Sequence, residues 1–327
     1  MGKQVWYFFK KNNLDLIWRN RVIGWCNSLP YRLYFVSFIN KAFGAKVARK
    51  IHKTIFKIRF WVKKKPIMPT CEYVITTHCT MKCKNCNTFI PYFTKDTHYK
   101  TTAYEQFVAD LDILCESVDY IDYFGFVGGE PMLNKDLDKM IEYACTKRQI
   151  RHIFLATSAT ILPKPQLLQV MKNQKVAVQL SDYRKVKFKN STIVYFDKFK
   201  QMLLEHNIKF SCPQEDTEGE GFQSMPQLYQ DKQDENKVVK MFDECWGQYA
   251  NMLCDGILTQ CPVSVFISRN LDLTNEVKQE IVNIREQKSI QTLTNQIINF
   301  YAKPHSAFCQ YCHIDNIQYG LPTGEQV

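Results

Sequence analysis

Residues 70–215 alternate short apolar runs with longer amphipathic segments. The short runs are rich in β-branched and aromatic residues, which is typical of strands, and the longer segments carry apolar residues at helical spacing. The predicted strands are residues 72–76, 120–127, 152–157, 176–180 and 209–212, and the predicted helices are residues 104–117, 137–146, 165–172 and 196–207. A strand followed by a helix, repeated four or five times, indicates a parallel sheet with crossover helices.

The segments on either side of this region differ from it in composition. Residues 1–69 are basic and aromatic, and apolar and lysine stripes at helical spacing in their second half predict a mostly helical extension. Residues 213–240 are polar and are predicted to be a connector. In residues 241–327, the Asp255-Gly256 pair predicts a hairpin with a type I′ turn. We therefore expect an N-terminal extension (1–69), an α/β core (70–240) and a small α+β C-terminal domain (241–327).

The positive charge of the chain is concentrated in its first part. The 327 residues have a formal net charge of +11, yet residues 1–70 hold 16 Lys and Arg against a single acid, Asp15. A cationic amphipathic segment rich in Trp and Phe can lie on an anionic membrane surface, which is one hypothesis for residues 1–65. A helical cap packed on the core is the alternative. Nucleic-acid binding is disfavoured because no recognisable nucleic-acid module accompanies the charge.

The cysteine content points to a reducing compartment. The chain has 13 cysteines, an odd number, and its start shows no secretory leader. No apolar run reaches the roughly 18 uncharged residues of a spanning helix. We therefore expect a cytoplasmic protein, with a peripheral position on the inner face of the membrane as an option. In that compartment, closely spaced cysteines are more often metal ligands or catalytic groups than bridges.

Three cysteines fall within one predicted loop after the first strand. Cys79, Cys83 and Cys86 form a C-x3-C-x2-C arrangement. Three thiolates this close can hold three corners of a cubane cluster and leave one iron without a protein ligand. Zinc sites usually pair cysteines as C-x2-C and close four ligands, although His78 could in principle be a fourth ligand here. The spacing favours an iron–sulfur cluster over zinc.

The second predicted strand ends in Gly128-Gly129-Glu130-Pro131. Two consecutive glycines let a ligand approach the backbone closely, and an acid and exposed carbonyls suit an ammonium group. Taken alone, the glycine pair would merely mark a turn. Together with the cysteine triplet, this segment resembles the radical S-adenosylmethionine (SAM) superfamily over residues 70–215. The resemblance implies a partial (β/α)6 TIM-like barrel.

The resemblance also implies cofactors and their ligands. The cysteine triplet would hold a [4Fe–4S] cluster with SAM at its open iron. Residues 128–131 would hold the methionine part of SAM. Ser181 and Asp182 follow the fourth predicted strand, where the superfamily places a polar ribose contact, and ordinary strand-end capping is the alternative for them.

Four cysteines of the C-terminal part form a second group. Cys245, Cys261, Cys309 and Cys312 resemble the ligands of a twitch domain, the shortened form of the SPASM extension found on some radical SAM enzymes. The resemblance implies one auxiliary [4Fe–4S] cluster on these four thiolates. An all-thiolate structural zinc site is the alternative.

The resemblance further implies a reaction. A one-electron donor such as flavodoxin or ferredoxin would reduce the first cluster, SAM would be cleaved to a 5′-deoxyadenosyl radical, and that radical would abstract a hydrogen atom from the substrate. Residues 180–183 and 260–262, with the terminal C-x2-C, look similar to radical SAM proteins of surface-polysaccharide and sugar modification. We therefore expect oxidation or epimerisation of a sugar-containing or lipid-linked substrate, with no catalytic residue assigned. A peptide-modifying maturase, or a zinc-stapled protein that binds nucleic acid or lipid, are the alternatives.

Overall fold

A computed structural model describes residues 62–93, 100–186, 188, 192–212, 224–229, 233–245, 247, 250–303, 305–318, 321 and 324–327. The predicted helical extension and its membrane contact therefore lie almost entirely outside the described residues. Half of the predicted connector, residues 213–240, lies outside them as well. Within the described residues, no helix has both the length and the apolar content needed to cross a membrane.

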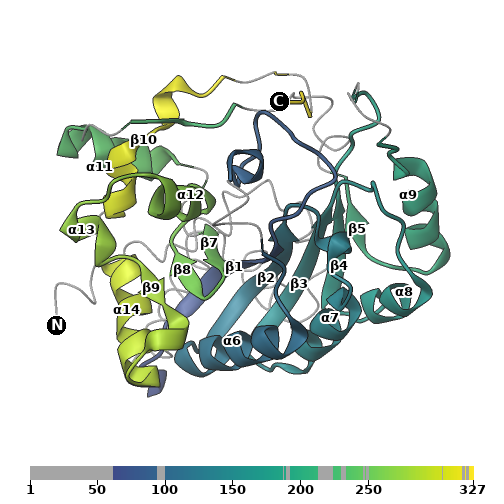
Figure 1. The fold of residues 1–327 in the computed structure, drawn as a ribbon. Helices are drawn as coiled ribbons and strands as arrows, with labels where there is room; N and C mark the ends of the chain where they lie inside the picture. The colour runs from purple at the N-terminus through teal and green to yellow at the C-terminus, as the bar shows by residue number, and fades with distance from the viewer. Residues whose placement is uncertain are drawn as a thin grey trace, which may run out of the picture.

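An eight-stranded sheet forms the centre of the fold (Figure 1), with the strand order β5-β4-β3-β2-β1-β7-β8-β9. From β5 to β7 all neighbouring strands are parallel, whereas β8 and β9 are antiparallel to their neighbours. The strands of the N-terminal part of the sheet are β1 (Ile67–Thr76), β2 (Tyr120–Gly128), β3 (Ile150–Thr157), β4 (Val176–Leu180) and β5 (Phe210–Ser211). The predicted α/β class with a parallel sheet is confirmed.

The helices between these strands match the predicted ones to within two residues at either end. They are α6 (Tyr104–Ser117), α7 (Leu137–Thr146), α8 (Pro165–Met171) and α9 (Phe196–Glu205). Their apolar stripes and the strands share one buried core, to which α6 contributes Phe107 and β2 contributes Phe124. The agreement follows from the clear helical period of these segments.

β1 begins five residues earlier than predicted, and it includes Pro69. A proline in a central strand normally argues against a strand, because it lacks the N–H that a neighbouring strand needs. β7 pairs with β1 only from Thr70 onward, so the start of β1 has a partner strand on one side only. The proline is therefore tolerated there.

The C-terminal part of the chain extends the same sheet. β7 (Ala250–Cys254) pairs in parallel with β1, and a tight turn leads into β8 (Ile257–Thr259) and then to β9 (Val282–Asn283). Asp255 and Gly256 have φ values of 49° and 77°, both positive, as the predicted type I′ turn requires. The sheet is thus continuous across residue 240, where the predicted core ends.

The remaining elements surround the C-terminal cysteines. They are β6 (Gln227–Leu228), α11 (Glu235–Glu244), α12 (Pro262–Asn270), α13 (Asn275–Lys278), α14 (Ile290–Ala302) and β10 (Cys312–His313), with β6 and β10 paired in a second, antiparallel sheet. α11 and β6 begin inside the predicted connector, so part of that polar segment is ordered secondary structure. α14 also packs against α6 of the core.

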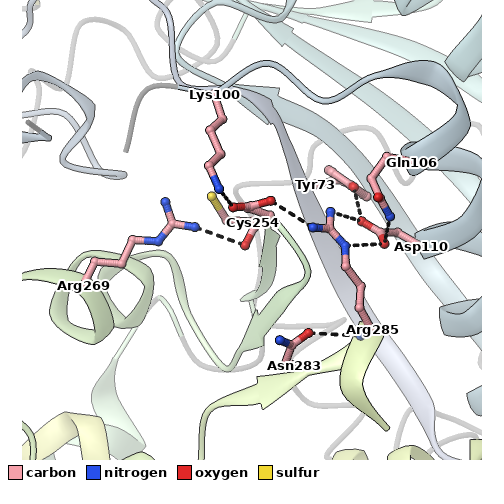
Figure 2. A network of polar contacts seen from close by, with 9 residues as sticks. Tyr73, Lys100, Gln106, Asp110, Cys254, Arg269, Asn283 and Arg285 are labelled. Carbon is pink, nitrogen blue, oxygen red and sulfur yellow. Dashed lines mark hydrogen bonds and ion pairs between the residues drawn. The ribbon is translucent and has the colours of Figure 1, made fainter. Parts of the chain in front are cut away.

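A buried ion pair joins the two halves of the sheet (Figure 2). Asp110 of α6 is fully buried and accepts two hydrogen bonds from the guanidinium of Arg285, at 2.8 and 2.9 Å. Its carboxylate also accepts bonds from the Tyr73 hydroxyl and the Gln106 amide. Arg285 continues to Asp255 at the hairpin turn, 2.9 Å away. A cluster of this kind fixes α6 and the β7–β8 hairpin relative to each other.

The largely buried carboxyl of Glu72 predicts a pH-dependent stability. Burial raises the pKa of Glu72 from 4.5 to about 7, and no described ion pair involves it. The folded state therefore binds more protons than the unfolded chain between these two values, and stability falls as the pH rises through this window. Glu72→Gln should be more stable than the parent at pH 8, with a difference that shrinks towards pH 5. Urea unfolding of the cluster-free chain at both pH values measures this.

The matched control for this experiment is Glu142→Gln, at an exposed position of α7. A stability difference between Glu72→Gln and the parent that stays constant from pH 5 to pH 8 would contradict the assignment.

Candidate functional site

The segments singled out from the sequence meet at one edge of the sheet. The cysteine loop follows β1, the Gly-Gly-Glu-Pro segment follows β2, and residues 157–160 and 181–182 follow β3 and β4. The carboxyl ends of parallel strands lie at the same edge, which is where ligands usually bind in α/β folds. The order of the strands in the sheet thus gathers these segments.

The thiols of the cysteine loop lie close enough to influence one another. Burial raises the pKa of the Cys83 thiol to about 12, and the neighbouring Cys86 adds to this. Burial likewise raises the pKa of Cys79, with smaller contributions from Cys86, Cys83 and Glu130. Buried thiols are poor thiolates unless a cation compensates them, and iron ions provide that compensation. The donor set, three neighbouring thiols in one loop, fits an iron–sulfur cluster with one iron left open.

The two glycines after β2 allow a close approach to this loop. A Cβ at Gly128 would lie 2.2 Å from the Thr76 carbonyl oxygen, and one at Gly129 would lie 2.1 Å from the His78 carbonyl oxygen and 2.8 Å from Cys79 Cβ. The Gly129 N–H donates to the Thr76 oxygen at 2.8 Å. The absence of side chains thus lets the end of β2 pack on the backbone that carries the cysteines.

Glu130 is a buried carboxylate, 1% exposed. One oxygen accepts bonds from the Thr157 hydroxyl (2.8 Å) and the Met132 N–H (3.2 Å), and the other accepts bonds from the N–H and hydroxyl of Ser158. Burial raises the pKa of Glu130, and these hydrogen bonds oppose the shift. No Lys, Arg or His of the described residues forms an ion pair with it. An ammonium group at this position would supply the missing positive charge. Pro131 follows at the first position of a short 3-10 helix, Pro131–Leu133.

A chain of hydroxyl groups links Glu130 to the cysteine loop. The Ser158 hydroxyl lies 3.0 Å from that of Thr160, and the Thr160 hydroxyl lies 2.6 Å from that of Thr80, which is next to Cys79. The turn that presents these groups places Ala159, a fully buried non-glycine residue, at φ 56°. Sequence reasoning did not assign Thr80, Thr157 or Thr160 to the site, although hydroxyl side chains at the end of a predicted strand were the available signal.

The residues after β4 are less directly joined to the site. The Ser181 N–H donates to the Thr157 carbonyl oxygen at 3.0 Å, which connects it to β3. Asp182 accepts three hydrogen bonds from Arg184, and these lower its pKa. The Asp182 carboxylate is therefore bonded to Arg184 of the same loop. A ribose contact stays a prediction for Ser181 and Asp182. Tyr183, which was not predicted, lies beside the three thiols and Glu130, whose charges raise its pKa together with burial, the main cause.

The four C-terminal cysteines line a single, partly open hollow. Cys245 directly follows α11 and Cys261 directly precedes α12, whereas Cys309 lies within a 3-10 helix, Ala307–Tyr311, and Cys312 directly follows it. The remaining lining is mostly apolar, including Phe308. Burial raises the pKa values of Cys309 and Cys312, and the other thiols of the hollow add to this. The structure thus brings together four cysteines that are up to 67 positions apart in the sequence.

The loop that carries Cys309 and Cys312 is anchored by polar side chains. Glu280, 6% exposed, accepts bonds from the Ser306 hydroxyl (2.7 Å) and the Ala307 N–H (2.8 Å) just before Cys309. The amide of Gln233 donates to the Cys312 carbonyl oxygen at 2.8 Å. These bonds hold the loop in the conformation that points both cysteines into the hollow.

Neither group of cysteines has the geometry of a site for one metal ion. Among the described residues, no three His, Cys, Asp or Glu side chains converge closely enough to hold a single ion. A tetrahedral zinc site needs four sulfurs about 2.3 Å from one centre. The four C-terminal thiols are candidate ligands because they line one hollow.

Comparison with known proteins agrees with this arrangement of motifs. Residues 73–181 match the family model of the radical SAM superfamily. No curated protein matches the chain significantly by sequence. The fold is similar to anSMEcpe with bound AdoMet (13% identity, 71% of this chain and 78% of that chain, TM-score 0.47). It is also similar to BtrN in complex with AdoMet and 2-DOIA (13% identity, 80% of this chain and 98% of that chain, TM-score 0.45). A third similar structure is Streptococcus suis SuiB bound to S-adenosylmethionine (10% identity, 86% of this chain and 80% of that chain, TM-score 0.40). Residues 73–181 of the chain thus form a domain of the radical SAM superfamily.

Proposed function

We propose that the chain is a radical SAM enzyme that removes a hydrogen atom from a sugar-containing substrate, of surface-polysaccharide or lipid-linked kind, and oxidises or epimerises it. The observation that carries the SAM-dependent part is Glu130, a buried carboxylate with no basic partner in the described residues, at the strand edge that also bears the cysteine loop. The sugar class rests on the sequence resemblance around residues 180–183 and 260–262.

In this proposal, each motif has a separate role. Cys79, Cys83 and Cys86 hold a [4Fe–4S] cluster, and Glu130 pairs with the ammonium group of SAM. Ser158 keeps the Glu130 carboxylate oriented through its N–H and hydroxyl. With cluster, SAM and an electron donor present, the chemistry supplied is the reductive cleavage of SAM to a 5′-deoxyadenosyl radical. The hydroxyl chain from Ser158 through Thr160 to Thr80 would link the residues that hold Glu130 to the loop that would hold the cluster.

Cys245, Cys261, Cys309 and Cys312 are proposed to hold an auxiliary [4Fe–4S] cluster. The shared hollow supports a common ligand for the four thiols, and the radical SAM domain upstream favours a cluster over zinc. An auxiliary cluster close to the substrate could accept the surplus electron of an oxidation, whereas an epimerisation needs a hydrogen donor instead. Whether these four cysteines hold a cluster therefore bears on whether the reaction is an oxidation or an epimerisation.

Anaerobic reconstitution tests the proposal. We expect about eight irons and eight sulfides per chain, as for two [4Fe–4S] clusters, with no zinc. With reductant, SAM and pools of nucleotide sugars, lipid-linked sugars or peptides, 5′-deoxyadenosine should rise most with a sugar pool. Cys309→Ala should retain SAM cleavage but lose product formation. Cys254→Ala should retain both, because Cys254 is a buried cysteine of the β7–β8 hairpin that does not line the hollow.

The possible results separate the alternatives. Iron near zero would refute the enzyme proposal and favour the zinc-stapled binding protein. About four irons with one zinc would place zinc in the C-terminal site. Stimulation by peptides alone would identify a peptide-modifying enzyme.

A further inference from the structure

Residues 324–327 lie against the loop that carries the first three cysteines. The Lys84 N–H donates to the Glu325 carbonyl oxygen at 2.7 Å, and the Val327 N–H donates to the Lys82 carbonyl oxygen at 2.9 Å. These two bonds flank Cys83, which forms an isolated antiparallel bridge with Gln326. The backbone on both sides of one thiol is therefore held by a segment from the other end of the described chain.

The contact depends on the backbone more than on the side chains. The Lys84 ammonium lies 3.2 Å from the Glu325 carboxylate, but both side chains are about half exposed, so this pair contributes little. The Tyr92 hydroxyl adds a bond to the Lys84 carbonyl oxygen at 2.8 Å. Lys84 is thus fixed through both its N–H and its carbonyl.

Gly324 extends this contact to the loop after β4. Its φ is 68°, a value that favours glycine, and a Cβ there would lie 2.7 Å from a methyl carbon of Val186 and 2.8 Å from the ring of Tyr183. Burial raises the pKa of Tyr183, and the three cysteine thiols and Glu130 are near enough for their charges to add to this. Residues 324–327 therefore span the edge of the sheet from the loop after β1 to the loop after β4.

We propose that residues 324–327 are a clamp that positions Cys83 for the first iron–sulfur cluster. The inference rests on the proposed function, because it assumes a cluster on the cysteine triplet. The cysteine loop has almost no regular secondary structure of its own, so ordering it costs conformational entropy. Contacts that order the loop beforehand favour retention of the cluster, since ligand binding is coupled to local folding.

The first measurement is amide hydrogen exchange on the cluster-free chain. A chain ending at residue 323 should exchange the Lys84 amide at least about tenfold faster than the full chain, because about one hydrogen bond's net stabilisation is lost on each side of Cys83. The amides of the α7 core should exchange equally in both chains, which shows that the shortened chain is folded. This readout needs neither iron nor activity.

The second measurement uses the anaerobically reconstituted protein. The shortened chain should release iron to a chelator about tenfold faster than the full chain. The change that SAM causes in the electron paramagnetic resonance spectrum of the reduced cluster should also be weakened, which a purely structural contact far from the cluster would not affect. Gly324→Ala, which keeps the length of the chain but cannot seat against Tyr183 without strain, should show the same effects to a smaller extent.

Glu325→Gln is the side-chain control. It removes the exposed ion pair and leaves the backbone bonds, so iron release should change by less than about twofold. Equal Lys84 exchange in the shortened and full chains would overturn the clamp. Faster exchange with unchanged iron release would show that the contact exists but does not position the cluster, which also overturns the proposal. Faster exchange in a chain that takes up no iron at all would instead locate the failure in the proposed function.

Discussion

Cys83→Ala should abolish the formation of 5′-deoxyadenosine and remove about half of the iron, the share of one of the two proposed [4Fe–4S] clusters. Cys83 is the middle cysteine of the triplet, and its thiol borders that of Cys86. With one of three ligands missing, an open cubane cannot be retained, and SAM loses its iron site. Iron analysis and product quantification after anaerobic reconstitution measure both effects.

Cys145→Ala is the matched control for this experiment. Cys145 is a half-buried cysteine at the end of α7 that packs against the core and belongs to neither group of ligands. The control should keep its full iron content and its SAM cleavage. Undiminished 5′-deoxyadenosine from Cys83→Ala would refute the assignment of the triplet.

Arg285→Met should lower the free energy of unfolding by about 3 kcal/mol, the typical cost of leaving a buried charge unpaired. Asp110 is fully buried and depends on Arg285 for its charged partner, whereas Tyr73 and Gln106 offer only neutral donors (Figure 2). Because Arg285 also reaches Asp255, the hairpin that follows β7 should loosen as well. Urea unfolding of the cluster-free chain measures the loss.

The double variant Asp110→Asn with Arg285→Met tests the reason for this loss. It removes the buried charge together with its partner, so its destabilisation should be clearly smaller than the sum of the two single changes. Lys139→Met, which removes an exposed ion pair with Asp136, should leave the unfolding midpoint unchanged. Additive losses in the double variant would contradict an interaction between Asp110 and Arg285.

Local patterns were sufficient for most of the core elements. α6 and α7 have the predicted bounds, as does β4, because a clear helical or strand period is a property of neighbouring residues. The turn at Asp255-Gly256 could also be predicted from the sequence, since both positions need residues that tolerate a positive φ. Pro69 misled the prediction, because its tolerance depends on where a distant strand begins to pair.

The sequence could predict the candidate site only where the residues that carry its chemistry are close together in the chain. The triplet of Cys79, Cys83 and Cys86 and the segment 128–131 each lie within a few positions. The spacing of the triplet suggested a cluster, and the resemblance of the two motifs to the radical SAM superfamily suggested SAM. Ser158 and Thr160 carry no such spacing. Their role follows from the bonds that they make with Glu130 and Thr80, which come from other strand ends.

The sequence by itself thus determined the class of fold, the superfamily and the two groups of cysteines, because periodicity, turn chemistry and motif spacing are local. The tertiary structure decided that β7 pairs with β1 and that Arg285 neutralises Asp110. It also decided that residues 324–327 flank Cys83. Each of these contacts joins segments more than 170 residues apart. Their formation depends on how the whole chain packs, and no local pattern in either partner specifies the other.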